Sequence, residues 1–189
     1  MVGVAIALVG MTLAGKTEVS NFLKSRGFGY IRLGAITEKK LKEAGLENTE
    51  ATNQVMRKRL REEYGMEAYA KLNYPEIEGM LKNGDVVIDN MMSWSEYKYF
   101  KTKIKKFFTV AVYAPPKVRY VRAETREVRS TKDFFKKNTP TERDYSEIEN
   151  LEKGGPIAMA DYTIDNSEQG KARLQEELDK FWKWFQHEA

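Results

Sequence analysis

The sequence predicts an α/β fold in which five parallel strands form one sheet and helices cover both of its faces. Five short apolar runs alternate with stretches of helical periodicity, and such alternation is typical of parallel strands joined by crossover helices. The strand-like runs cover residues 2–9, 30–33, 85–89, 107–114 and 162–165. The first run carries no charge, as expected for a strand that is buried on both faces.

Helix boundaries support the same alternation. Two segments have the sequence of a capping box, in which a Ser or Thr and a Glu three residues later each satisfy a backbone N–H of the other. These segments are Ser93-Trp94-Ser95-Glu96 and Thr139-Pro140-Thr141-Glu142. We expect Asn83-Gly84 to end the helix before the third strand, and a last helix over residues 169–186. Residues 55–81 have a helical pattern with interruptions at Gly65 and Pro75, which predicts two or three helices.

Length and composition predict a single domain over residues 1–189. Hydrophobic residues make up 41% of the chain and charged residues 32%, which suits one core with a charged surface. No apolar run is long enough to span a bilayer, so we expect a cytoplasmic protein without signal peptide or membrane segment. The chain has no cysteine, and its one histidine is His187, which excludes disulfides, thiolate metal sites and histidine acid–base chemistry.

A phosphate-binding loop is predicted directly after the first strand. Residues 10–17 fit the pattern G-x-x-x-x-G-K-[ST], and residues 16–24 have the spacing of a helix start. Backbone N–H groups of such a loop and the N-terminus of the following helix bind phosphate. The lysine would reach the β- and γ-phosphates and the threonine hydroxyl would bind Mg²⁺, so we predict ATP and Mg²⁺ as cofactors. The predicted nucleotide-binding residues here are Gly10, Met11, Thr12, Leu13, Ala14, Gly15, Lys16, Thr17 and Glu18.

Asp89 ends the third strand-like run. In open parallel sheets, ligands bind beyond the carboxyl ends of the strands. A carboxylate there can hold Mg²⁺, directly or through water, or assist the attacking oxygen of a phosphoryl acceptor. The alternative is that Asp89 only caps the next helix. We predict Thr17 and Asp89 as the magnesium-binding side chains.

Four arginines, Arg119, Arg122, Arg126 and Arg129, are spaced three, four and three residues apart and share one helix face. Acidic residues of the same helix do not lie at positions that would neutralise this stripe. Either carboxylates from elsewhere pair with it or it faces phosphate, which the guanidinium fork binds in a bidentate manner. We favour phosphate, and we expect only some of the four arginines to contact the ligand. The basic segment 130–139 is then either a flap over the phosphate site or a solvated connection.

With these residues, the chain resembles P-loop kinases of the nucleoside monophosphate kinase and dephospho-CoA kinase superfamily, in particular an archaeal dephospho-CoA-kinase-like branch. The similar segments are residues 10–17, Tyr30-Ile31-Arg32-Leu33-Gly34, Leu60-Arg61-Glu62-Glu63-Tyr64-Gly65, Val86-Val87-Ile88-Asp89, Glu142-Arg143-Asp144 and Ala160-Asp161-Tyr162-Thr163-Ile164-Asp165-Asn166. The resemblance implies a three-layer P-loop NTPase fold with strand order 2-3-1-4-5. It also implies a helical acceptor-binding region at 34–82, a lid at 119–143, and Asn166 in a loop beside the adenine of ATP.

The site residues that follow from the pattern and the resemblance fall into three groups. The predicted catalytic residues are Lys16, Asp89, Arg122 and Arg126. Arg122 and Asn166 join the nucleotide-binding residues. The predicted acceptor-binding residues are Arg32, Gly34, Arg61, Asp89, Asn90, Arg129 and Arg143, although an isolated arginine such as Arg32 or Arg61 is more often a surface residue.

The chain departs from the family pattern in its acceptor half. Ala35 and Glu38 stand where relatives have L-G-D followed by arginine, and Met92 ends a segment that usually reads D-G-x-R. Leu13 stands where relatives often have glycine, which the general loop pattern permits. The sequence therefore predicts an intact donor site and an altered acceptor site.

The leading hypothesis is transfer of the γ-phosphoryl group of Mg·ATP to a nucleotide-like small molecule by a monomer or homodimer. One alternative is a nucleotide-dependent switch or ATP-binding module without an acceptor, although the guanine motif Asn-Lys-x-Asp is absent from the sequence. Another alternative is a kinase for a polynucleotide end, suggested by Lys101, Lys103, Lys105 and Lys106, which otherwise form a solvated helix end. The modest net charge of +4 favours a small anionic partner no less than nucleic acid.

The arginine stripe generates a prediction about motion. Mutual repulsion of the arginines opposes closure until phosphate arrives, so bound Mg·ATP and acceptor should draw residues 119–139 towards the loop at 10–17. We expect amide hydrogen exchange across residues 122–138 to slow markedly on binding, while exchange in residues 2–9 is slow throughout. Equal protection of 122–138 with and without ligands would mean that the arginines form a static salt-bridged face.

Overall fold

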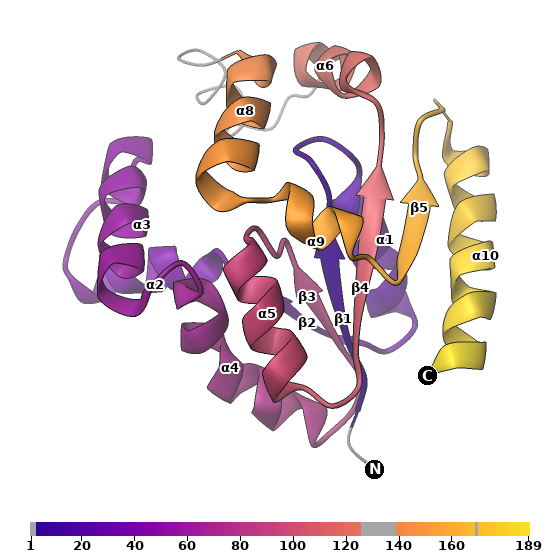
Figure 1. Ribbon diagram of the computed structural model, residues 1–189, viewed down its shortest axis with the longest axis horizontal. Coiled ribbons are helices and arrows are strands. Elements are labelled where there is room, and N and C mark those ends of the chain that lie inside the picture. Colours follow the sequence, from indigo (N-terminus) through magenta and orange to yellow (C-terminus); the bar gives the residue numbers. More distant parts are fainter. Residues whose placement is uncertain (1–2, 126–138, 169) are drawn as a thin grey trace.

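The computed structural model describes residues 3–125, 139–168 and 170–189. It contains one sheet of five strands in the order β2-β3-β1-β4-β5, and the strand pairs that join them are all parallel (Figure 1). The strands are β1 Ala5–Val9, β2 Gly29–Arg32, β3 Val86–Asp89, β4 Phe107–Tyr113 and β5 Tyr162–Asp165. The predicted α/β class, strand number and strand order are confirmed.

The first strand lies at the centre of the sheet, between β3 and β4. All five of its residues are buried, as the uncharged apolar run predicts. Alternate side chains of a strand point to opposite faces, so β1 contributes to both layers of the core. Ala5, Ala7 and Val9 belong to one hydrophobic cluster, and Ile6 and Leu8 belong to the other.

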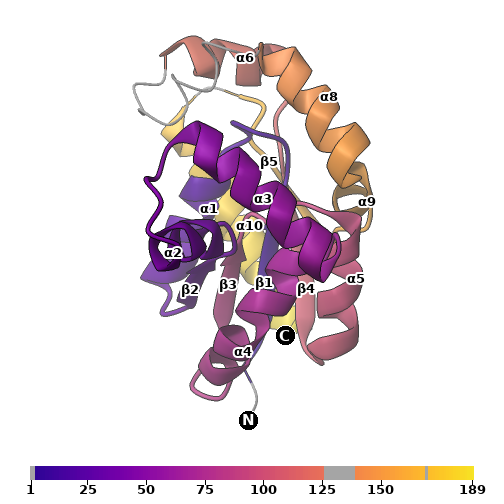
Figure 2. The same ribbon diagram turned by 90° about the vertical axis from the view of Figure 1, so that its left-hand side faces the viewer.

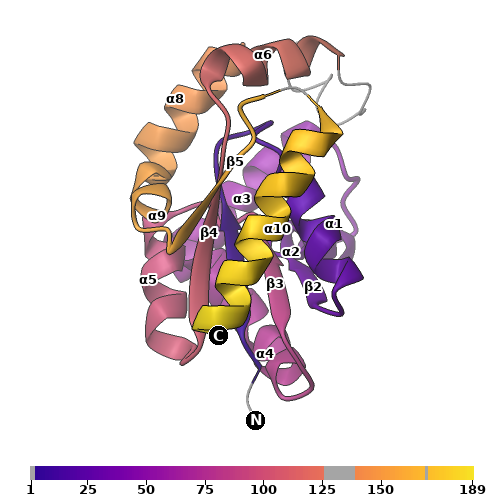
Figure 3. The ribbon, with the colours of Figure 1, turned by 90° about the vertical axis from the view of Figure 1, so that its right-hand side faces the viewer.

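Helices cover both faces of this sheet, which gives three layers. The helices are α1 Lys16–Ser25, α2 Ala35–Glu43, α3 Glu50–Tyr64, α4 Ala68–Leu81, α5 Trp94–Lys103, α6 Pro116–Thr125, α8 Pro140–Leu151, α9 Gly154–Ala158 and α10 Lys171–Glu188. Buried side chains of α1 and α10 pack on one face, and those of α2 to α5 pack on the other. Figure 3 shows α1 and α10 together on their face, and Figure 2 shows α3 and α4 on the opposite side.

The predicted helix caps are present. The side chains of Ser93 and Thr139 each accept a hydrogen bond from the backbone N–H of a Glu three residues later, which completes both capping boxes. The break predicted at Gly65 is observed, but the interruption predicted at Pro75 is wrong because α4 continues through it. Burial of Ala70, Ile77 and Leu81 against the sheet offsets the cost of a proline inside a helix, about 3 kcal/mol.

Two helices lie beyond the carboxyl ends of the strands. In Figure 1, α6 and α8 form the upper edge of the molecule, above the tip of β4 and the loop that follows β1. The basic segment predicted as a flap falls mainly on residues 126–138, which lie outside the described residues, as do Arg126 and Arg129. The sheet therefore presents one edge, with a loop and two helices around it, at which a site can form.

The aromatic stripe of α10 should carry much of the stability of its face of the core. Phe181 is fully buried and its ring lies 5.5 Å from that of Tyr162 on β5. Replacing it with alanine leaves a cavity, so we expect Phe181→Ala to lower the free energy of unfolding by about 3–5 kcal/mol in urea denaturation. The exposed Lys183→Ala on the same helix is the matched control and should change it by less than about 0.5 kcal/mol. Similar small losses for both variants would contradict this packing.

Candidate functional site

The loop between β1 and α1 has the backbone of a phosphate cradle. Gly10 and Gly15 adopt φ values of 137° and 109°, which favour glycine. A Cβ atom on Gly15 would lie 2.2 Å from Nδ2 of Asn166, so glycine is also required by space. Leu13 has φ 66° in the left-handed region, which costs a non-glycine residue of the order of 1–3 kcal/mol. Glycine would adopt this conformation without that cost.

Three side chains, from two other parts of the chain, hold the carbonyl groups of this loop. Arg119 Nη1 donates to Thr12 O at 3.2 Å, and Arg122 Nη1 donates to Leu13 O at 3.2 Å and to Ala14 O at 3.4 Å. Asn166 Nδ2 also donates to Ala14 O, at 2.8 Å. The N–H and C=O of a trans peptide point in opposite directions. Carbonyl groups held outward in this way leave the loop N–H groups directed to the inside, where they can bind an anion.

Lys16 lies at the inside of the same loop. Its ammonium group donates to Gly10 O at 2.7 Å and to Met11 O at 3.0 Å. Loss of hydration in this enclosed position, together with the positive charge of Lys153, lowers its pKa to about 7, although Glu147 and Asp89 act in the opposite direction. A phosphate group in the cleft would supply the negative charge that favours the ammonium form.

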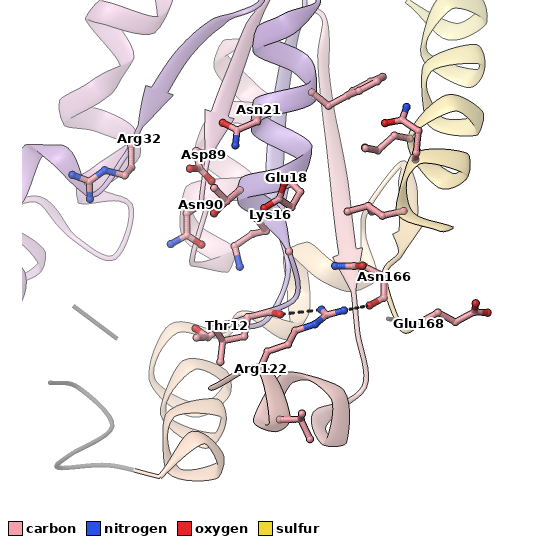
Figure 4. Close-up of a pocket in the computed structure, with 18 of the residues that line it drawn as sticks. Thr12, Lys16, Glu18, Asn21, Arg32, Asp89, Asn90, Arg122, Asn166 and Glu168 are labelled. Atoms are coloured by element: carbon pink, nitrogen blue, oxygen red, sulfur yellow. Dashed lines mark hydrogen bonds between the residues drawn. The ribbon is translucent and has the colours of Figure 1, made fainter. Parts of the chain in front are cut away.

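The ends of β2 and β3 bring a second set of polar groups to the cleft. Arg32 and Asp89 are register partners on these strands, and both line the cleft. Asp89 Oδ2 accepts a hydrogen bond from Tyr30 Oη at 2.8 Å, while Arg32 Nη2 pairs with Glu38 Oε1 at 2.6 Å. Figure 4 shows Arg32, Asp89 and Asn90 on one side of Lys16. Glu38, one of the departures from the family pattern, therefore binds the arginine that precedes it.

Asn90 follows Asp89 with φ 68°, which asparagine tolerates better than most residues. Its buried Oδ1 has no hydrogen-bond partner among the described residues. Glu96 supports the same loop from α5, because its Oε2 accepts from the backbone N–H of Met92 at 2.7 Å and of Ser93 at 3.3 Å. The capping glutamate thus also fixes the segment that carries Asp89 and Asn90.

The arginine stripe has two different roles in the structure. Arg119 is buried, and its guanidinium makes a bidentate pair with Asp144 of α8, with distances of 2.8 and 2.6 Å. For Arg119 the structure shows the alternative of a partner carboxylate from elsewhere in the chain, 25 residues further on. Arg122 instead lines the cleft, and its Nη2 donates to Asn166 O at 2.7 Å (Figure 4).

These groups surround an open cleft with a volume of about 1440 Å³. A site for one drug-sized ligand typically measures about 300–1,000 Å³, so the cleft has room for two ligands side by side. The predicted site residues that line it are Thr12, Leu13, Gly15, Lys16, Thr17, Glu18, Arg32, Asp89, Asn90, Arg122, Arg143 and Asn166. Gly10, Met11 and Ala14 belong to the loop, and their carbonyl groups accept hydrogen bonds from Lys16 and Asn166.

Gly34 and Arg61 do not line this cleft. The guanidinium of Arg61 stacks on the ring of Tyr69 at 5.2 Å and lines a separate groove between α3 and the end of α8. Arg57, one helical turn earlier, lines both this groove and the main cleft, and is held by Glu50 at 2.6 Å. The spacing of four residues puts both arginines on one helix face, which is the signal that could have identified Arg57.

A second part of the cleft was also absent from the sequence prediction. It runs from the phosphate loop between α1 and α10, and Figure 4 shows Asn166 and Glu168 on the side of Lys16 away from Arg32. Its lining residues are Asn21, Phe22, Ser25, Glu168, Gly170, Leu174, Gln175 and Leu178. Packing of α10 against α1 creates this part, and the sequence spacing within either helix does not reveal it.

In the part of the chain that the structure describes, no three His, Cys, Asp or Glu side chains gather as a metal site. The oxygen donors that line the cleft include the Thr17 hydroxyl and the Asp89 carboxylate. These donors fit Mg²⁺, which usually takes one or two protein ligands and completes its shell with phosphate oxygens and water. None of the described helices combines the length and apolar character needed to cross a bilayer.

Comparisons with known proteins agree with this geometry. Residues 6–152 match a family described as an AAA domain. The chain is 32% identical over 185 residues to a UPF0200 protein of Thermococcus onnurineus, covering 93% of this chain and 96% of that protein. Two solved structures show the same architecture at lower identity, TT1252 from Thermus thermophilus and a shikimate kinase from Bacteroides thetaiotaomicron.

The similarity to both structures extends along the whole fold. TT1252 has a TM-score of 0.67 and 18% identity, covering 100% of this chain and 98% of that one. The shikimate kinase has a TM-score of 0.64 and 16% identity, covering 97% of this chain and 98% of that one. At such identities the similarity shows the fold, which is that of P-loop kinases.

Because Glu96 is buried, the free energy of unfolding should depend on pH. Loss of hydration raises its pKa from 4.5 to about 7, against the hydrogen bonds from Met92 and Ser93 that favour the charged form. Between these two pH values the folded protein holds a proton that the unfolded chain has released. The free energy of unfolding should therefore fall as pH rises from about 4.5 to 7, by on the order of 3 kcal/mol from this group.

The variant Glu96→Gln removes this titration and keeps an oxygen for the backbone N–H groups. Urea denaturation at pH 5 and pH 7.5 should show a smaller loss of stability for the variant than for the native protein. Glu149→Gln, exposed on α8, is the control and should follow the native protein. A native pH dependence in Glu96→Gln would show that Glu96 is ionised throughout this range.

Proposed function

The chain belongs to the AAA domain family and to the UPF0200 proteins, and on that premise we propose that it is a cytoplasmic, ATP-dependent phosphotransferase acting on a small molecule. The observation that carries the proposal is the enclosed lysine of the phosphate loop, which faces a cleft with room for two ligands. Phosphoryl transfer needs little covalent chemistry from the protein and depends on positioning and charge. The similarity to a shikimate kinase supports this class of reaction.

The donor would bind on the side of Arg122 and Asn166. Its phosphates would lie against the N–H groups of residues 10–17, with Lys16 on the β- and γ-phosphates and Thr17 on Mg²⁺. The nucleoside would enter the part of the cleft between α1 and α10, where Leu174 and Phe22 offer apolar surface and Asn21 and Gln175 offer amides. Bound Mg²⁺ would neutralise charge that develops on the transferred group.

The acceptor would bind on the side of Arg32, Arg57 and Asp89. Two arginines suit a phosphate or carboxylate on the acceptor, and Asp89 is placed to accept a proton from, or to orient, its attacking oxygen. A nucleoside monophosphate or a dephospho-CoA type of molecule is the acceptor class that we propose, with residues 34–82 as the acceptor-binding region. Arg126 and Arg129, with residues 119–143 as a lid, complete the proposed site.

One observation favours a second function, an ATP-binding module or switch without a small acceptor. Glu38 already pairs with Arg32 and Glu50 with Arg57, each at 2.6 Å, so both arginines of the acceptor side have internal partners. The four side chains are between 37% and 46% exposed, and each such pair is worth no more than about 1 kcal/mol, so an anionic acceptor could displace it. Turnover that ignores every added acceptor would favour the module.

The variant Lys16→Ala tests the proposal. We expect it to fold and to lower the rate of phosphoryl transfer from Mg·ATP by at least 10²–10³-fold, since one preorganised charge is worth roughly this factor. The assay follows ADP formation and phosphorylated product with a panel of nucleoside monophosphates, dephospho-CoA and oligonucleotide ends. Lys183→Ala, which is exposed on α10 and does not line the cleft, is the control. Near-native turnover by Lys16→Ala would exclude the proposed site. Transfer to oligonucleotide ends alone would show that the acceptor is a polynucleotide and not a small molecule.

A further inference from the structure

The helix α8 turns charged side chains to the body of the protein. Asp144 and Glu147 are buried, while Tyr145 and Ile148 are 61% and 48% exposed. A surface helix ordinarily buries its apolar face and exposes its charges. Because apolar contact is not what docks α8 here, its position depends on directional ion pairs and hydrogen bonds. One of these pairs, Asp144 with Arg119, has been described above, and the other involves the phosphate loop directly.

Glu147 accepts hydrogen bonds from three different segments. Its Oε1 accepts from Thr12 Oγ1 of the loop at 2.8 Å and from Arg143 Nε of its own helix at 3.1 Å. Its Oε2 accepts from Lys153 Nζ at 2.6 Å. Thr12 lies 135 residues before Glu147 in the chain, so this carboxylate joins α8 to the loop.

The charge of Glu147 is stable in this position. Burial alone would raise its pKa, but the positive charges of Lys153 and Arg143 and the hydrogen bonds from Lys153 and Thr12 lower it to about 2. Lys153 is itself only 1% exposed, so the two form a buried ion pair. Such a pair is weak evidence for stability, because hydrophobic residues of the same volume often serve as well. The contacts of Glu147 with Thr12 and Arg143 indicate that its role is to orient these side chains.

Arg143 is the partner that faces ligands. Its side chain is 27% exposed and lines the cleft, and its Nε is held by Glu147. The guanidinium is planar, so a bond at Nε fixes the direction of the whole fork. Arg143 and Lys16 line the same cleft, and the charge of Arg143 acts on the Lys16 ammonium.

We propose that Glu147 is a positioning residue for phosphoryl transfer: it aims Arg143 at the terminal phosphate of the nucleotide and ties that arginine to Thr12 of the phosphate loop. The proposal rests on the function proposed above. Glu147 does not touch the nucleotide, and Lys153 keeps its carboxylate ionised and in place. Removing the charge should therefore weaken the recognition of ATP through Arg143, and should affect ADP, which lacks the terminal phosphate, much less.

The test compares Mg·ATP and Mg·ADP dissociation constants by titration calorimetry for the native protein, Glu147→Gln, Arg143→Ala and the double variant. We expect either single variant to weaken ATP binding by about 10- to 100-fold, as is typical when a residue that orients a ligand-binding side chain is lost. ADP binding should weaken by no more than about threefold. The double variant should bind ATP no more weakly than Arg143→Ala, because both changes remove the same contact between Arg143 and the terminal phosphate. Glu149→Gln, exposed on the same helix, should bind as the native protein does.

Three results would overturn the proposal. If Glu147→Gln weakened the binding of ATP and of ADP equally, Glu147 would only maintain the shape of the loop. If ATP binding were unchanged, Glu147 would have no role in binding. If the losses of the two single variants added up in the double variant, Glu147 would act independently of Arg143. Because Glu147 is buried and its variant can fail to fold, Arg143→Ala, with its partly exposed side chain, independently tests the selectivity for ATP. Absence of nucleotide binding by the native protein would instead overturn the proposed function itself.

Discussion

The anion-binding loop depends on one arrangement: the carbonyl groups of residues 12–14 are held outward, so that the loop N–H groups can bind an anion. The donors come from Arg119 and Arg122 of α6 and from Asn166 after β5. They can meet at the loop because β4 pairs with β1 and β5 pairs with β4. The strand order therefore places three donors that are distant in sequence beside one turn. Their hydrogen bonds stabilise Leu13 in a conformation that leucine rarely adopts.

Charge, rather than apolar area, connects the two helices above the sheet to this loop. The ion pairs Arg119–Asp144 and Lys153–Glu147 are both buried, while Tyr145 and Ile148 of α8 are exposed. Breaking a buried pair is costly because it leaves an unpaired charge, so these contacts permit few alternative arrangements of α8. A site built in this way has defined geometry before any ligand is present. That property is what electrostatic catalysis requires, since preorganised charges need not rearrange during the reaction.

The sequence predicts the sheet and the loop well because their signals are local. The strand predicted at 162–165 coincides with β5, and both capping boxes form as their spacing indicates. Pro75 shows where local reasoning fails, because packing of α4 on the sheet overrides its helix-breaking tendency. The roles of Arg119, Arg57 and Glu147 could not be predicted, since each is decided by partners or a cleft wall from other segments. Helical spacing places the arginines on one face, but only the tertiary structure tells which of them meets a carboxylate.

A crystal structure of the protein with Mg²⁺ and a non-hydrolysable ATP analogue tests directly whether the loop is preorganised. In this structure the Lys16 ammonium should leave the carbonyl groups of Gly10 and Met11 and bind the β- and γ-phosphates. The donors from Arg119, Arg122 and Asn166 should stay on the carbonyl groups of Thr12, Leu13 and Ala14. An analogue bound outside the loop, or a loop whose carbonyl groups lose these donors when the phosphates bind, would contradict the claim that the site is preorganised.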